Sequence, residues 1–123
     1  MPEFDLIIRN GRVISSDRDK VADIGIRGER IVEVGRVDGT ADKEIDASGK
    51  IVTPGGVDSH GHIEQMSGMG LMNADTFETA TRSAALGGTT TTMSFAPQTA
   101  GSTLKGAVED YAERATRGSY VDH

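Results

Sequence analysis

The 123-residue sequence contains no cysteine and no tryptophan, and it is poor in basic residues. The lack of cysteine excludes a disulfide scaffold, a cysteine nucleophile and a cysteine metal ligand. Thirteen lysines and arginines face 19 acidic residues, which gives a formal net charge of −6. Surfaces that bind nucleic acid or anionic membranes are normally basic, so neither partner is expected. No apolar run approaches the roughly 18 residues of a membrane span, and no signal-peptide apolar region is found, so we expect a cytoplasmic protein.

Aromatic residues are sparse, at 4%, whereas glycine is abundant, at 16 residues. The glycines stand singly or in pairs between periodic apolar segments, which is typical of turns and not of low-complexity tracts. These features predict a folded chain that does not bury a full core by itself.

Residues 1–53 show the close spacing of short strands. Phe4–Arg9 and Arg12–Ile14 flank Asn10-Gly11, which is a strong signal for a two-residue hairpin turn. Further strands are expected at Val21–Arg27, Arg30–Val34, Lys43–Asp46 and Ile51–Thr53. We therefore predict antiparallel strands that form the N-terminal part of a composite β-sandwich domain over residues 1–53.

The pattern changes after Pro54-Gly55-Gly56 to alternating strands and helices. The first helix carries a capping-box pattern, with Asp75 as N-cap and Glu78 three residues later. Such alternation indicates an α/β fold with a parallel sheet and crossover helices. A (β/α)8 barrel uses about 31 residues per unit, so residues 54–123 would hold two units of an incomplete barrel and the opening of a third strand. The expected strands are Val57–Ile63, Thr89–Phe95 and the opening of a third at Ser119–His123. The first helix is expected to end near Leu86, and the second to start at Ser102 and end at Gly118.

The sharpest local feature is the pair of histidines in Asp58-Ser59-His60-Gly61-His62. Alternate residues of a strand project to the same side, so His60 and His62 are expected to point together near the strand end where barrel enzymes place their sites. Two imidazoles on one face suit a divalent metal such as zinc. Asp58 has the same parity and is in position to accept a hydrogen bond from a ring N–H. The alternative is two unrelated histidines, one packed and one solvated.

Three segments together resemble the amidohydrolase superfamily and, within it, the dihydropyrimidinase and hydantoinase family of cyclic amide hydrolases. These segments are Phe4–Gly11, Ile51–His62 and Ala84–Thr90. The resemblance covers the whole chain but only the N-terminal portion of the family's length. It implies the first two βα units of a metal-dependent (β/α)8 (TIM) barrel. It also implies an enzyme that opens a C–N bond of a cyclic ureide or imide, with a small cyclic amide as substrate.

The resemblance also implies a binuclear metal centre, usually zinc, and the residues that hold it. In the family the ligands are the His-x-His pair, a carbamylated lysine, two further histidines and an aspartate. His60 and His62 would be ligands of the more buried metal, whereas the other ligands and the general base lie on later strands. No catalytic residue is therefore expected within this chain, and the 123 residues alone are expected to be inactive. The family further implies a homo-oligomer, usually a tetramer.

The loop after the histidines is rich in apolar side chains, namely Met66, Met69, Leu71 and Met72. The family uses the corresponding loop as a flexible apolar wall over the substrate, and methionine suits such adaptable contacts. The alternative is a loop that packs against a neighbouring barrel loop or subunit. Glu64 is interpreted mainly as a solvated loop carboxylate, and His123 as a residue that binds no metal.

Two other functions fit the resemblance less well. One is a non-catalytic, dihydropyrimidinase-like structural or interaction protein that has lost its metal ligands, but the presence of His60 and His62 speaks against it. The other is a different amidohydrolase, such as an allantoinase or an N-acyl-D-amino-acid deacylase. The residues do not identify which ring is the substrate.

Overall fold

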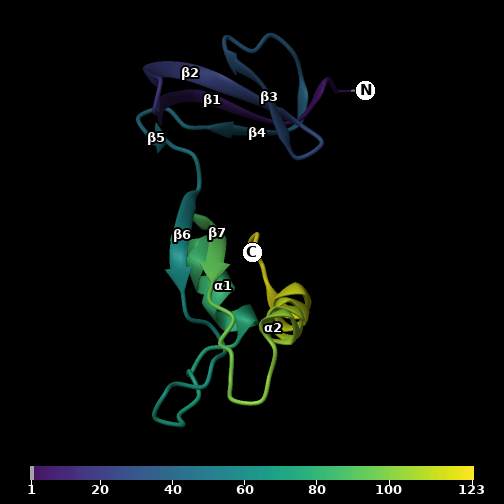
Figure 1. The fold of residues 1–123 in the computed structure, drawn as a ribbon. Helices are drawn as coiled ribbons and strands as arrows, with labels where there is room; N and C mark the ends of the chain where they lie inside the picture. Colours follow the sequence, from purple (N-terminus) through teal and green to yellow (C-terminus); the bar gives the residue numbers. More distant parts are fainter. Residues whose placement is uncertain (1) are drawn as a thin grey trace. The chain divides into compact units, whose positions relative to one another are not determined.

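A computed structural model describes residues 2–123, and the chain divides into two compact units between Pro54 and Gly55. The first unit contains a five-stranded sheet, and the second contains a two-stranded sheet with two helices (Figure 1). In residues 2–123, none of the helices combines the length and the apolar character needed to cross a bilayer.

The first unit is a mixed sheet, whereas the sequence predicted only antiparallel pairing. Its strands are β1 (Phe4–Ser15), β2 (Arg18–Arg27), β3 (Arg30–Gly35), β4 (Ala41–Asp46) and β5 (Ile51–Val52). The order is β3-β2-β1-β4, and β5 also pairs with β1. β1 pairs antiparallel with β2 but parallel with both β4 and β5. The prediction was wrong because residues 36–40 carry the chain back to the same end of the sheet, so that β4 starts beside the start of β1.

The predicted hairpin turn at Asn10-Gly11 is also wrong, because β1 continues through it as one strand. Asn10 has a φ of 61°, and the register between β1 and β2 shifts there, which is the geometry of a bulge. The Asn10 N–H donates to the Asp23 carboxylate at 2.9 Å, and its side-chain amide donates to Asp46. These partners hold Asn10 inside the sheet, and the turn lies instead at Ser16-Asp17.

A charged network joins three strands of this sheet at Arg9. Its guanidinium donates to Glu44, to Asp23 and to the carbonyl of Val37. The Asn10 N–H, followed by the Val37 N–H and Arg9, holds the pKa of Asp23 below its ordinary value against the opposing effect of burial. Asp23 is therefore the most connected carboxylate of the network.

The first unit should lose stability in acid through Asp23. A carboxyl whose pKa is lowered on folding stabilises the folded state above its unfolded pKa of about 3.9, and this stabilisation disappears as the pH falls through the folded pKa. We expect the free energy of unfolding to drop as the pH falls below about 4, and Asp23→Asn to flatten that drop. Denaturant titrations at several pH values measure it. Asp42→Asn, at an exposed position of β4, is the matched control and should leave the pH dependence unchanged.

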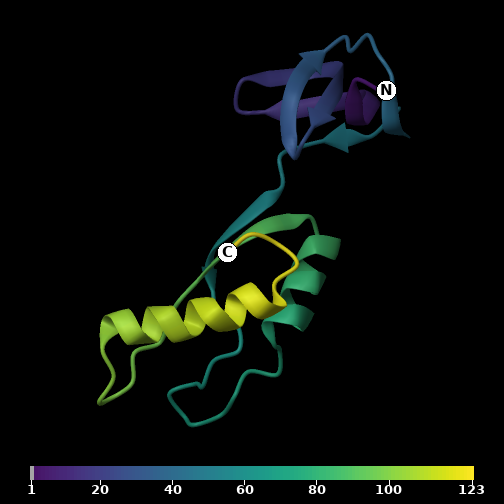
Figure 2. The same cartoon turned by 90° about the vertical axis from the view of Figure 1, so that its right-hand side faces the viewer.

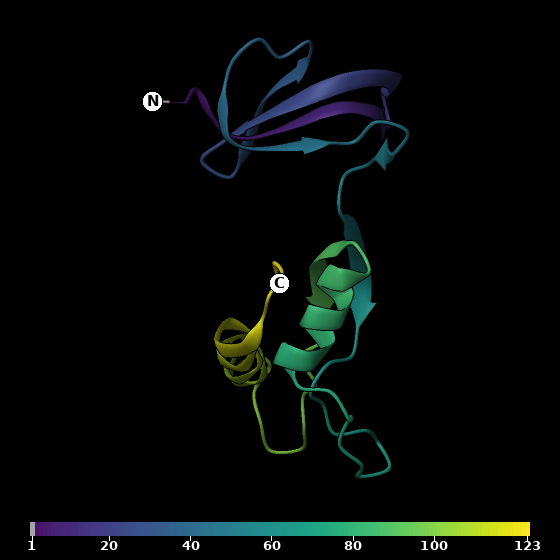
Figure 3. The ribbon, with the colours of Figure 1, turned by 180° about the vertical axis from the view of Figure 1, so that it is seen from behind.

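In the second unit, strands alternate with helices along the chain. Its elements are β6 (Gly56–Gly61), α1 (Phe77–Leu86), β7 (Thr89–Ser94) and α2 (Leu104–Gly118). β6 and β7 pair in parallel, and α1 connects them. The α1 helix covers one face of this pair, and α2 lies beside α1 (Figures 2 and 3). At the carboxyl ends of the two strands, long loops lead into the helices (Figure 1).

The predicted third strand appears only as a single parallel bridge. Asp122 pairs with Thr91, the Thr92 N–H donates to the Asp122 carbonyl at 2.8 Å, and the Asp122 N–H donates to the Thr90 carbonyl at 3.1 Å. This bridge lies on the edge of β7 away from β6, because β6 occupies the other edge. The chain after α2 thus returns beside β7 in the direction expected of a parallel sheet that grows strand by strand.

Both helices start one residue later than the sequence predicted. The N-cap of α1 is Thr76, not Asp75, and its hydroxyl accepts the Thr79 N–H while the Thr79 hydroxyl accepts the Thr76 N–H. Threonine at both positions forms the reciprocal capping box that was predicted for Asp75 and Glu78. The second helix is capped by Thr103, one residue after the predicted start at Ser102.

A small core fixes the helices of the second unit to its strands. Ile63, Phe77, Tyr111 and Ala115 are buried together, and the rings of Phe77 and Tyr111 meet edge to face with centroids 5.0 Å apart. Tyr111 thereby places its hydroxyl beside the backbone of Ile63, immediately after the two histidines.

Candidate metal centre

His60 and His62 lie where β6 ends, and their rings converge. His60 is the next-to-last residue of β6, and His62 follows directly after the strand. Their Nε2 atoms are 3.3 Å apart, and their ring centroids are 5.2 Å apart. Phe95 packs against both rings, with its centroid 4.4 Å from that of His60 and 5.2 Å from that of His62. Two imidazole nitrogens that converge in this way can contact one ion without a change in the backbone.

The carboxylate of Asp58 does not contact a histidine ring in this structure. It accepts the backbone N–H of His60 at 3.0 Å instead. The partner of an imidazole nitrogen is Gln65, whose Oε1 lies 3.0 Å from Nδ1 of His62. The contact of Gln65 with His62 could not be predicted from the sequence, because the backbone becomes irregular after His62 and turns the Gln65 side chain back toward the histidine.

Glu64 is not the free loop carboxylate that the sequence suggested. Its Oε2 accepts the N–H of Phe77 at 2.9 Å, at the first position of α1. An anionic acceptor at a helix N-terminus satisfies one of the unpaired amides and opposes the positive end of the helix dipole. Glu64 therefore ties the segment after the histidines to α1.

The apolar loop after the histidines folds back on itself. Met66 and Met72 form an isolated antiparallel bridge, and the Ser67 N–H donates to the Leu71 carbonyl at 2.7 Å. The side chains of Met66, Met69, Leu71 and Met72 are between 53% and 84% exposed. The loop thus presents apolar surface near the carboxyl end of β6, and nothing in residues 2–123 covers it.

The described residues do not form a complete metal site by themselves. In residues 2–123, no group of three or more histidine, cysteine, aspartate or glutamate side chains is placed to hold one ion. His123, the third histidine, lies away from the pair, with its ring centroid 6.4 Å from that of Phe77. Imidazole nitrogens are ordinary ligands of zinc and similar metals, so the donor set fits part of a metal centre whose other ligands come from elsewhere.

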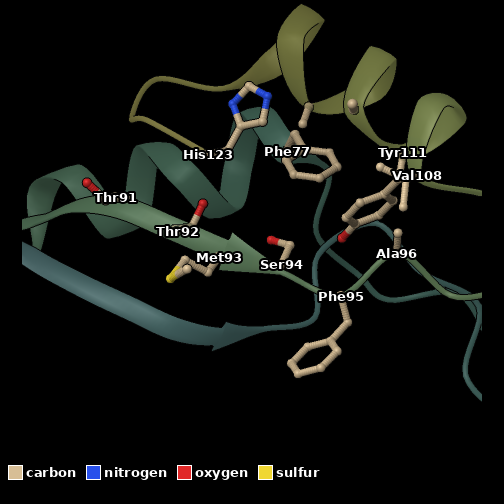
Figure 4. A pocket seen from close by; sticks show the side chains of 12 residues that line it. Phe77, Thr91, Thr92, Met93, Ser94, Phe95, Ala96, Val108, Tyr111 and His123 are labelled. Carbon is tan, nitrogen blue, oxygen red and sulfur yellow. The ribbon is translucent and has the colours of Figure 1, made fainter. Parts of the chain in front are cut away.

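A cavity of about 670 Å³ opens beside β7 and α2 (Figure 4). Phe77, Val108 and Tyr111 form much of its apolar lining, and His123 borders it. The buried hydroxyls of Thr92 and Ser94 have no hydrogen-bond partner within residues 2–123. This face of β7 is therefore incompletely packed by the described chain.

The chain is similar to hydantoinases in both its sequence and its structure. No family model matches the chain. The chain is 43% identical over 120 residues to a D-hydantoinase of Rhizobium radiobacter, and the alignment covers 98% of this chain. A solved structure of a D-hydantoinase superposes with a TM-score of 0.91 at 42% identity over 97% of this chain.

Over the residues it spans, the chain belongs to the hydantoinase and dihydropyrimidinase family. It spans only 26% of the length of the Rhizobium radiobacter relative and 26% of the solved chain, at their N-terminal ends. An allantoinase of Escherichia coli is 46% identical over 88 residues, which is 72% of this chain and 19% of that relative. The resemblance seen in the sequence is therefore confirmed, and the mixed sheet and helices of the chain match the N-terminal part of hydantoinase structures.

Proposed function

We propose that this chain is the N-terminal part of a metal-dependent hydrolase that opens a C–N bond of a cyclic amide. The observation that carries the proposal is the convergence of the His60 and His62 Nε2 atoms to 3.3 Å at the carboxyl end of β6. The 43% identity to a D-hydantoinase extends over nearly the whole chain, including this segment. Because the chain is a quarter of that relative's length, the activity belongs to the complete protein and not to these residues alone.

We assign to each unit a place in the complete protein. Residues 1–53 would form part of a composite β-sandwich domain, and residues 54–123 would form the first two units of a (β/α)8 barrel. The parallel β6–β7 pair with a crossover helix supports this assignment. So does the Asp122 bridge on the outer edge of β7. The apolar cavity beside β7 would then be filled by the following barrel segments.

His60 and His62 would hold one divalent metal ion, and zinc is the ion we propose. A bound metal of this kind polarises an amide carbonyl and activates water for attack on it. The residues of this chain contribute binding and orientation: the two imidazoles supply ligands, and Phe95 packs against both rings and limits their movement. The carbamylated lysine, two further histidines and aspartate of the binuclear centre would come from later strands, as would the general base. Asp58 keeps a supporting role, because its bond to the His60 N–H fixes the backbone at that ligand.

The loop of Met66, Met69, Leu71 and Met72 would form an apolar wall over the substrate. Its side chains are exposed at the carboxyl end of β6, which would be the side of a barrel where substrates bind. The substrate would be a small cyclic ureide or imide, and the complete enzyme a cytoplasmic homo-oligomer. The similarity to an allantoinase over 88 residues supports allantoin as a second candidate substrate.

A hybrid enzyme tests this function. The chain replaces the aligned segment of the Rhizobium radiobacter D-hydantoinase, and the purified hybrid is assayed with substituted hydantoins, dihydrouracil and allantoin in the presence of zinc or manganese. We expect metal-dependent ring opening of at least one of these substrates, because the chain would supply two metal ligands whose Nε2 atoms already converge. The parent hydantoinase is the positive control. A folded hybrid that binds metal and opens none of the rings contradicts the proposed function.

A further inference from the structure

We propose that Gln65 is a positioning residue that fixes the tautomer of His62, with the proton on Nδ1 and a lone pair on Nε2. The bond between Gln65 Oε1 and His62 Nδ1 is 3.0 Å long, and the Gln65 side chain is buried. The part of this inference that concerns metal binding rests on the function proposed above. The part that concerns the tautomer does not.

The orientation of the Gln65 amide follows from its other partners. Its Nε2 donates to the backbone carbonyl of Phe95, and it also donates to the hydroxyl of Tyr111 at 2.9 Å. A backbone carbonyl can only accept, so the NH2 group must face Phe95, and a flipped amide would set two oxygens against each other. The Oε1 atom must therefore face His62.

This orientation determines where the proton of His62 resides. An amide oxygen only accepts, so Nδ1 of His62 must carry the hydrogen. In a neutral imidazole the other nitrogen then has a free lone pair, and this nitrogen is the Nε2 atom 3.3 Å from Nε2 of His60. A metal ligand whose second ring nitrogen donates to an oxygen is held in the tautomer and orientation that coordination needs.

The Gln65 side chain is held in place by buried groups from distant parts of the unit. Tyr111, on α2 and 5% exposed, donates its hydroxyl proton to the Ile63 carbonyl, so that its oxygen accepts from Gln65. The backbone of Gln65 is fixed as well, because its N–H donates to the Asn73 side chain and its carbonyl accepts the Asn73 N–H. A glutamine with few free rotamers orders a ligand more effectively than a solvated one, because little conformational entropy remains to be lost.

Nitrogen-15 NMR of the histidine side chains in the full 123-residue chain tests the proposal. Spectra are recorded without metal at about pH 8, where a free imidazole with a pKa of about 6.5 is neutral. We expect His62 to be protonated on Nδ1, and the exposed His60 serves as an internal comparison. Gln65→Met should release His62 to the Nε2–H form. Gln98→Met makes the same change at an exposed glutamine, and it should alter neither ring.

Zinc titration of the same samples tests the consequence for binding. Loss of an outer partner of a ligating histidine typically weakens metal affinity about 10- to 100-fold, so Gln65→Met should weaken zinc binding by about 10-fold or more. A His62 that is mainly protonated on Nε2 in the unmodified chain overturns the proposal, as does Gln65→Met with an unchanged tautomer and zinc affinity. Should Gln65→Met fail to fold, the spectrum of the unmodified chain still decides the tautomer. An inactive hybrid with the expected tautomer would refute the proposed function alone.

Discussion

His60→Ala and His62→Ala should each abolish metal binding and nearly all ring opening in the hybrid enzyme. Each change removes one of the two converging Nε2 atoms, so that water would occupy the ligand position that this atom leaves on the metal. The loss should exceed the roughly 10- to 100-fold that follows removal of a residue that merely supports a ligand. Both side chains are exposed within the chain, so the fold should persist. The measurements are the metal content of the purified variants and the turnover of the substrate that the unmodified hybrid opens.

His123→Ala is the matched control for this prediction. It removes the third histidine of the chain, whose ring lies near Phe77 and away from the other two histidines. The control variant should keep its metal and its turnover. Unchanged metal content and turnover in either His60→Ala or His62→Ala would show that the two histidines are ordinary residues at a strand end and not metal ligands.

Phe77→Ala should remove most of the stability of the second unit. Phe77 is 1% exposed and lies at the centre of a core of only four buried residues. Truncation of a buried phenylalanine to alanine costs about 3–5 kcal/mol, because the cavity that it leaves cannot close completely. That amount is a large part of the stability of an ordinary domain, about 5–15 kcal/mol. Hydrogen exchange of backbone amides in the full chain measures the effect and separates the two units.

The amides of β7 and α2 should lose protection in Phe77→Ala, whereas those of β1 and β2 should keep theirs. Leu86→Ala provides the control, since Leu86 is in the same helix and 84% exposed. A surface substitution of this kind changes stability by no more than about 0.5 kcal/mol. Equal protection of the second unit in both variants would show that Phe77 does not hold its core together.

The convergence of the two histidines could be predicted from the sequence because it depends on local geometry. Two residues that are two apart at the end of a strand point to the same side whatever surrounds them. The order of strands and helices after residue 54 was predictable for a similar reason, since the helices and the glycines that follow them are marked by periodicity and caps. Even so, the competition between Asp75 and Thr76 for the N-cap was decided by the Thr79 hydroxyl, which the simple capping pattern does not consider.

The features that could not be predicted depend on residues far apart in the chain. Gln65 orients His62 only because Tyr111, 46 residues later, lies beside it. The bulge at Asn10 exists because Asp23 and Asp46 supply partners for its backbone and side chain. The local sequence favours a turn there, and long-range hydrogen bonds override that preference. The parallel pairing of β4 with β1 is likewise set by where the connection returns, and the strand residues themselves carry no signal for it.

The one-sided pairing of β6 has a consequence for the order in which a complete barrel would assemble. Within residues 2–123, β6 pairs only with β7, and the next strand position is on the far side of β7. In a closed barrel the free edge of β6 would meet the strand farthest from it along the chain. Closing so long a loop costs more entropy than pairing neighbours, and contacts of high sequence separation form slowly. The strand that carries His60 would therefore be the first of the barrel strands to be synthesised and the last to be enclosed. An ion captured there before closure would link only two nearby residues and constrain little of the chain.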